Sequence, residues 1–281
     1  MMSFTDLQPG LQTVRLQLRE FFPDPGEMAR FLNSLDRFMQ SDSAHDHLFE
    51  VHGQELVYRT EQLVPTLSDQ QTPLLLLFGN PARHSVRSGM FFASEGNGRD
   101  HRLWRALETA GIFSLGSGEQ PAPPDEVRQL SLRRKDAILN LSYSSPFRVG
   151  FAVFYSMPSP ASGSRWAGVS GLHHIWGQPA FSRLQTLEAE RINRLIRSFV
   201  KPRGAVFAFQ KDAYSALCSP DSPPYSQSAA LDGHLLGTYT HDPSIRIFGC
   251  PPTRFMYSPR AVAALCTYRK SALSPTCLSG G

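Results

Sequence analysis

The chain has 281 residues, which is enough for one large domain or two ordinary ones. Hydrophobic residues make up 41% and charged residues 19%, which excludes a coiled coil or a charged disordered tail as the main architecture. No apolar run approaches the roughly 18 residues that a membrane span needs. The first residues lack a basic segment followed by a long apolar stretch, so we expect no secretion signal and a cytoplasmic protein.

Charge is distributed unevenly along the chain. Residues 1–70 carry 5 basic and 11 acidic side chains, whereas residues 71–281 carry 23 basic and 13 acidic ones. Of all 28 basic residues, 24 are arginines, whose planar guanidinium suits phosphates and base edges. The sequence therefore favours a polyanionic partner for residues 71–281, and we expect residues 1–70 to face away from it.

The first quarter of the chain contains one clear helix signal. Asp24 precedes Pro25, and Glu27 follows three residues after Asp24, which is typical of a capped helix start. Apolar residues then recur at helical spacing as far as Met39. We therefore predict that residues 1–70 form a helical extension packed on the main body.

The remainder of the chain alternates between strand and helix signals. Leu74–Phe78 is a short apolar run between Pro73 and Gly79, which predicts a buried strand. Further along we predict helices over 99–110 and 183–199, strands over 137–142, 150–155 and 205–209, and loops over 115–126, 157–168 and 218–229. This alternation predicts an α/β domain over 71–281, a three-layer α/β/α sandwich with a parallel-type sheet. Ligands of such sheets bind at the carboxyl ends of the strands.

The cysteines and the glycines give no sign of a metal or cofactor site. Cys218, Cys250, Cys266 and Cys277 include no closely spaced pair, so we expect free thiols. The chain has neither a phosphate loop of the Walker type nor a Gly-x-Gly-x-x-Gly turn. A His173–His174 pair has no third ligand in view and favours a structural or sugar-contacting role. We expect that the protein needs neither a metal nor a cofactor.

A polar turn follows the first predicted strand of the domain. It reads Phe78-Gly79-Asn80-Pro81-Ala82, and an aromatic pair and a helix start reading His-Arg-Leu-Trp at 101–104 come after it. This order resembles the uracil-DNA glycosylase superfamily, most closely its mismatch-specific uracil/thymine branch. The resemblance covers about residues 73–250. It implies an α/β/α glycosylase fold and a DNA partner, either double-stranded with a flipped base or single-stranded.

The resemblance also implies roles for individual residues. Asn80 matches the position that holds the attacking water, and Phe92 matches the phenylalanine that stacks on the flipped base, with Phe91 as its alternate. Asn140 resembles the asparagine that reads the base at a strand end; a buried asparagine satisfied by the backbone is the equal alternative. No lysine occupies an obvious nucleophile position, so we expect a monofunctional enzyme without a Schiff base. We also expect a monomer.

The third matching segment departs from the family. The family has His-Pro-Ser or Asn-Pro-Ser, whereas here Asp242 fills the first position and His241 precedes it. Either of these two side chains could stabilise the leaving base, and Ile245 and Arg246 fall in the region that wedges into the duplex. Phosphate contacts are expected from further polar residues, namely Arg83, Arg87, Ser142, Ser145 and Ser244. A basic cluster at 128–135 is either a solvated face or a DNA contact.

Ala82 bears on the choice of substrate. In the strictly uracil-specific branch this position holds a tyrosine that blocks a substituent at C5 of the pyrimidine, and in the mismatch branch it holds glycine. The small Ala82 therefore favours a 5-substituted pyrimidine, such as a hypermodified phage cytosine, with a role in antiviral defence. The alternatives are a repair glycosylase for uracil or mismatched thymine, a non-catalytic DNA-binding member, and an unrelated α/β hydrolase.

Overall fold

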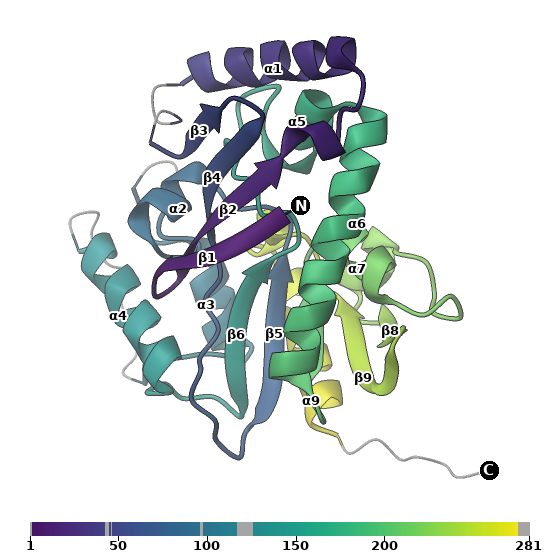
Figure 1. Ribbon diagram of the computed structural model, residues 1–281. Coiled ribbons are helices and arrows are strands. Elements are labelled where there is room, and N and C mark those ends of the chain that lie inside the picture. The colour runs from purple at the N-terminus through teal and green to yellow at the C-terminus, as the bar shows by residue number, and fades with distance from the viewer. Residues whose placement is uncertain (1, 43–44, 46, 96–97, 117–125, 275–281) are drawn as a thin grey trace. The chain divides into compact units, whose positions relative to one another are not determined.

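The computed structural model describes residues 2–42, 45, 47–95, 98–116 and 126–274 (Figure 1). The chain forms two compact units, each built from separate stretches of sequence. The first comprises Met1–Leu63, Gly79–Phe91 and Val153–Ile192, and the second comprises Val64–Phe78, Phe92–Ala152 and Asn193–Gly281. The division therefore differs from the expected boundary at residue 70. Each unit is described by itself.

The first unit contains a four-stranded antiparallel sheet with the order β1-β2-β4-β3. Its strands are β1 (Met2–Gln8), β2 (Leu11–Gln17), β3 (Phe49–His52) and β4 (Glu55–Glu61). Gly10 and Gly53 have positive φ angles of 86° and 61° in the turns of the two hairpins. The expected helical extension is therefore mostly sheet, because these glycine turns let strands with alternating apolar residues pair.

Helices complete the first unit. They are η1 (Leu18–Glu20), α1 (Pro25–Gln40), α2 (Arg83–Ser88), α5 (Gly168–Trp176) and α6 (Gln178–Leu195). The predicted start of α1 is confirmed, because the Asp24 carboxylate accepts a hydrogen bond from the Glu27 backbone N–H at 2.8 Å. Phe31 of α1 packs on Trp176 of α5 with ring centres 4.7 Å apart. The predicted loop over 157–168 is also present, whereas His173 and His174 lie on helix α5.

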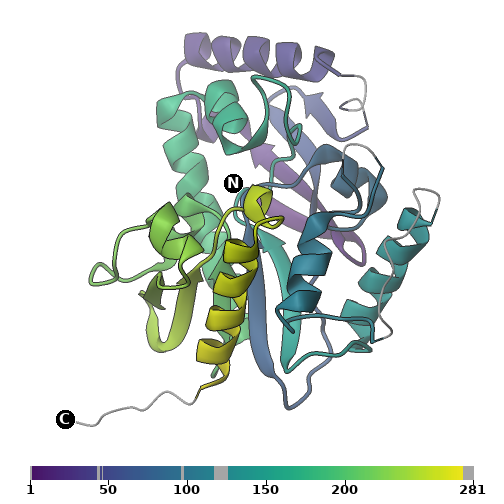
Figure 2. The ribbon, with the colours of Figure 1, turned by 180° about the vertical axis from the view of Figure 1, so that it is seen from behind.

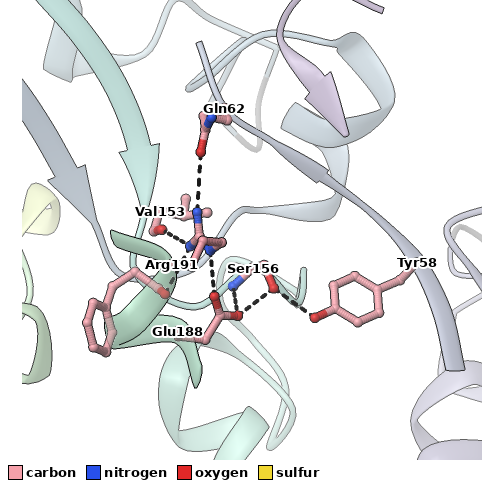
Figure 3. A network of polar contacts seen from close by, with 7 residues as sticks. Tyr58, Gln62, Val153, Ser156, Glu188 and Arg191 are labelled. Atoms are coloured by element: carbon pink, nitrogen blue, oxygen red, sulfur yellow. Dashed lines mark hydrogen bonds and ion pairs between the residues drawn. The ribbon is translucent and has the colours of Figure 1, made fainter. Parts of the chain in front are cut away.

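A buried polar network lies inside the first unit (Figure 3). The Glu188 carboxylate accepts hydrogen bonds from the Ser156 backbone N–H and hydroxyl and, at 2.7 Å, from Arg191 Nε. Arg191 also donates to the carbonyl oxygens of Val153 and Phe154. Because Ser156 gives its own proton to Glu188, the Tyr58 hydroxyl donates to Ser156 Oγ at 2.7 Å. The network fixes the strand-to-loop segment at 153–156 against α6.

The second unit contains a five-stranded mixed sheet with the order β6-β5-β7-β9-β8. Its strands are β5 (Thr72–Phe78), β6 (Phe147–Val153), β7 (Ala205–Ala208), β8 (Leu236–Tyr239) and β9 (Asp242–Gly249). Strands β5, β7 and β9 run parallel, and β8 pairs antiparallel with β9. The predicted strands over 74–78 and 205–209 are thereby confirmed, and the α/β class with them.

Helices lie on both faces of this sheet. They are α3 (Arg102–Thr109), α4 (Val127–Asn140), the π-helix η3 (Ile196–Val200), α7 (Lys211–Leu217), α8 (Gln227–Leu231), η4 (Thr253–Phe255) and α9 (Pro259–Leu273). Figure 2 shows α3 and α9 in front of the sheet. The ring of Phe199 in η3 meets the sheet at Gly150, where a Cβ would lie 2.9 Å from it. This layering is compatible with a three-layer sandwich.

One predicted strand is a helix. The segment 137–142 was expected to be a strand, but α4 runs to Asn140 and ends at Leu141, which has a left-handed φ of 55°. The buried residues of α4 include Leu130, Arg134 and Ile138, whose four-residue spacing gives one helical face. The short apolar run at 137–142 is the end of that face. Most of the predicted loop at 115–126, and Cys277, fall outside the described residues.

Among the described residues, no helix combines the length and the apolar character that a membrane crossing requires. The same residues contain no cluster of His, Cys, Asp or Glu with the makings of a metal site.

Candidate active site

The carboxyl edge of the five-stranded sheet is the natural place for a ligand. Strand β5 has β6, the next strand in the chain, on one side and β7 on the other, so the order reverses between β5 and β7. Ligands of such sheets bind at this reversal, beyond the carboxyl ends of the strands. Phe78 ends β5 and Phe209 follows β7, and their rings stack at 4.8 Å. Two stacked, buried aromatic rings therefore lie where the topology predicts a ligand.

Phe92 is the most unusual residue at this edge. Its φ angle is +48°, in a region that large side chains rarely adopt. The half-buried ring packs edge-on against Phe78, with centres 4.7 Å apart. The Trp104 indole N–H donates to the Phe92 carbonyl at 3.1 Å, and the Ser131 hydroxyl donates to the carbonyl of Ala93. A strained backbone that neighbouring groups hold in place is typical of functional sites.

His101 lies beside Phe92, with ring centres 4.7 Å apart. It caps the start of α3, where its Nδ1 accepts a hydrogen bond from the Leu103 backbone N–H at 3.2 Å. Because a backbone N–H can only donate, Nδ1 carries no proton, and the neutral ring holds its proton on Nε2. The N–H of this ring is therefore on Nε2, and the ring lies beside Phe92.

Ion pairs brace the segment that carries these two rings. Arg134 donates to both oxygens of Asp100, at 2.6 and 2.8 Å, and its guanidinium lies over Trp104. Hydrogen bonds from Arg102 lower the pKa of Glu95 from 4.5 to about 2. Within the basic cluster at 128–135, Arg134 is therefore a buried structural residue, whereas Arg128 and Arg133 are exposed.

The segment that follows β9 was not predicted from the sequence. Residues 250–258 leave the same carboxyl edge, since β9 runs parallel to β7. Tyr257 is 68% exposed, and the guanidinium of Arg102 lies 5.6 Å from its ring centre. Arg254 is also exposed on this segment. The sequence signal that could have predicted this segment is an arginine and a tyrosine shortly after a buried parallel strand.

The Asn80 turn belongs to the first unit and follows β5 in the chain. The Asn80 amide nitrogen donates to Ser159 Oγ at 2.8 Å and to the Met157 carbonyl at 3.3 Å. A carbonyl oxygen can only accept, so the amide nitrogen must face Met157. This orientation turns the acceptor oxygen Oδ1 away from these partners, where it can accept a hydrogen bond from water.

The neighbouring predicted residues have different surroundings. Ala82 is half-buried, precedes α2 and forms a parallel bridge with Ser159. Phe91 is only 1% exposed, so it is a core residue rather than the alternate stacking ring. Arg83 pairs with Asp42 at 2.5 Å, whereas Arg87 is exposed.

Two predicted residues of the second unit have structural positions. Asn140 is the exposed last residue of α4 instead of the end of a buried strand, which removes the basis for its base-reading role. The Ser145 hydroxyl donates to the Ile112 carbonyl at 2.6 Å and accepts from the Phe147 N–H at 2.9 Å. Its hydrogen bonds therefore fix the start of β6.

The third predicted segment lies at the opposite edge of the sheet. His241 and Asp242 stand at the amino end of β9, whereas Phe78 stands at the carboxyl end of the parallel β5. Gly249 is level with Leu77 through Ala208, so Asp242 is displaced by seven residues, about 23 Å at 3.3 Å per residue. The structure does not bring His241 or Asp242 to the carboxyl edge.

The side chains of this third segment have local partners. Asp242 pairs with Lys201 at 3.1 Å, and hydrogen bonds from Ser244 and Lys201 lower the pKa of Asp242. Ile245 is fully buried, and Arg246 donates to carbonyl oxygens at the end of α9. Neither residue is placed to wedge into a duplex. The segment lies at the amino edge because it precedes β9 instead of following it.

Comparisons of the chain with protein-family models and with curated proteins found no match.

Proposed function

We propose that the protein is a monofunctional DNA glycosylase that flips out a pyrimidine and hydrolyses its N-glycosidic bond. The observation that carries the proposal is Phe92, a strained and partly exposed ring over Phe78 at the strand-order reversal. A half-buried aromatic ring with a histidine beside it suits stacking on a flipped base. The Asn80 turn follows Phe78 by two residues in the chain, and Asn80 is the polar side chain that we propose for the reaction.

The chemistry divides among three side chains. The flipped base stacks on Phe92, and Asn80 Oδ1 orients a water for attack at C1′ of the sugar. As the glycosidic bond breaks, its electron pair leaves with the base, which becomes anionic. The His101 Nε2–H, at the amino end of α3, donates to that anion and stabilises it. His101 thus takes the role that was expected of His241 or Asp242. The water's oxygen bonds to C1′, and its protons pass to solvent and base.

The substrate we favour is a 5-substituted pyrimidine in DNA, such as a hypermodified phage cytosine. The small side chain of Ala82 in the Asn80 turn supports this choice, because it offers no bulk against a C5 substituent. A role in antiviral defence belongs to the same proposal. The three-layer uracil-DNA-glycosylase-like fold is part of it as well.

The test of the substrate compares DNAs that differ only in one base. Purified protein is incubated with duplexes carrying uracil, a thymine mismatch, 5-hydroxymethylcytosine or glucosylated cytosine, and alkali-labile sites are counted. We expect the 5-substituted cytosines to give the highest rate. Equal cleavage of the uracil duplex would remove the argument from Ala82 and favour the repair glycosylase.

A non-catalytic DNA-binding protein is the second candidate. The position of His241 and Asp242 favours this candidate. Both lie at the amino end of β9, so neither provides at the carboxyl edge the His or Asn of the superfamily's third motif. Such a protein would bind the same duplexes with a steep dependence on salt and release no base.

Replacing Phe92 with alanine should slow base release by about ten- to a hundredfold, because stacking on one aromatic ring contributes roughly 1–3 kcal/mol per base. Single-turnover rates on a modified duplex measure the effect. Phe92→Tyr keeps the ring and should retain most of the activity. Equal rates for Phe92→Ala and the native protein would contradict the stacking role.

His101 can be tested apart from its capping role. His101→Asn keeps an acceptor for the Leu103 N–H but lacks the Nε2 donor, whereas His101→Ala lacks both. We expect both variants to lose about ten- to a hundredfold in base release, as hydrogen bonds to charged groups contribute roughly 1.5–3 kcal/mol. Only His101→Ala should also lose about 1 kcal/mol of stability, measured by urea unfolding. Native activity in His101→Asn would exclude the donor role.

A further inference from the structure

The first unit contains a groove that no part of the proposed chemistry uses. Its volume is about 430 Å³, and buried Leu11, Leu48 and Val86 form its floor. Three cationic or titratable side chains line it as well, from three separate elements: His47 ahead of β3, Arg59 on β4 and Arg87 on α2. All three are exposed. The fold therefore gathers positive charge around an apolar floor.

The charge of this groove is not neutralised within the described residues. Neither His47, Arg59 nor Arg87 forms an ion pair or side-chain hydrogen bond there. Asp42 pairs with Arg83. Glu61 lies two residues beyond Arg59 on β4, and its carboxyl is buried away from the groove's exposed arginines, which raises its pKa well above the usual value.

We propose that this groove, lined by His47, Arg59 and Arg87, binds a backbone phosphate of the DNA strand that carries the target base. The inference rests on the proposed function and extends it to the N-terminal sheet. Helix α2 begins directly after the Asn80 turn. Arg87 lies five residues beyond Ala82, about 7.5 Å along the helix at 1.5 Å per residue. This distance is close to the spacing of two successive nucleotides along a DNA strand, at about 3.4 Å each.

The groove changes the expected role of the acidic first quarter. Residues 1–70 were expected to face away from DNA, because they carry 5 basic and 11 acidic side chains. Arg59 and His47 belong to that quarter, and they join Arg87 from α2 within one unit. The net negative charge of residues 1–70 therefore does not predict the charge of the surface that His47 and Arg59 form beside α2.

The test measures DNA binding by the full chain as a function of salt. The probe is a short fluorescent duplex with one abasic-site analogue, and the variant is Arg59→Gln/Arg87→Gln. Each phosphate contact contributes about 0.9 to the slope of log affinity against log salt. We expect the double variant to bind more weakly and its slope to fall by about one to two. Arg37→Gln removes one arginine charge from an exposed position on α1 outside the groove and should leave the slope unchanged.

A slope in the double variant equal to that of Arg37→Gln would overturn the inference. So would displacement of the duplex by millimolar inorganic phosphate at constant ionic strength, since that result indicates a small-anion site. Base release is measured in parallel to separate the two proposals. Base release with an unchanged slope contradicts only the groove, whereas a reduced slope without base release contradicts only the glycosylase.

Discussion

Asn80→Ala should lower base release by about a hundred- to a thousandfold while DNA binding is retained, because one positioned polar group in a reaction site contributes about that factor. The Asn80 amide nitrogen donates to Ser159 Oγ at 2.8 Å and to the Met157 carbonyl, which fixes the orientation of the side chain before substrate arrives. Alanine removes the acceptor and leaves the attacking water unoriented. Single-turnover base release and duplex affinity, measured on the same preparation, check both parts.

Ser159→Ala is the matched control for Asn80. It removes one partner of the amide nitrogen but leaves Oδ1 and the hydrogen bond to Met157. We expect a loss of only a few-fold in base release. A loss as large as that of Asn80→Ala would mean that the shape of the 157–160 loop matters, instead of the Asn80 oxygen.

The largest expected effect on stability is that of Glu188→Ala. This change removes the partner of Arg191, whose guanidinium would remain buried and unpaired, and such changes cost about 3–5 kcal/mol. It also leaves the Ser156 backbone N–H without its acceptor. Urea unfolding followed by circular dichroism measures the loss.

Two further variants serve as controls for Glu188→Ala. Glu190→Ala removes an exposed carboxylate from the same helix and should change stability by less than about 0.5 kcal/mol. A Glu188→Leu/Arg191→Met double variant removes both charges and should be more stable than Glu188→Ala. If Glu188→Ala unfolds like Glu190→Ala, the buried network does not stabilise the first unit.

Local signals predicted the parts of the fold that depend on neighbours in sequence. Asp24 and Glu27 predict the start of α1, and the apolar run before Gly79 predicts β5. The prediction of a strand over 137–142 was wrong because a short apolar run is compatible with the end of a helix as well as with a strand. The prediction of a helical extension was wrong because Gly10 and Gly53 form hairpin turns, so the strands beside them pair into a sheet.

The candidate site was predictable only where a motif directly follows a strand. Asn80 and Phe92 were found in this way. His101 is part of the predicted helix start. Its proposed role depends on which ring nitrogen accepts the hydrogen bond from the Leu103 N–H, and the sequence does not specify this. His241 and Asp242 were misplaced because the edge of a sheet at which a segment lies depends on strand direction and pairing. Tyr257 was missed for the same reason.

The most direct test of the account is mass spectrometry of small molecules released from modified duplex DNA by the native protein and by Asn80→Ala. We expect a free pyrimidine base and an abasic site from the native protein. The variant should bind the same duplex and release far less base. DNA bound by the native protein without any released base would contradict the glycosylase and leave the DNA-binding alternative.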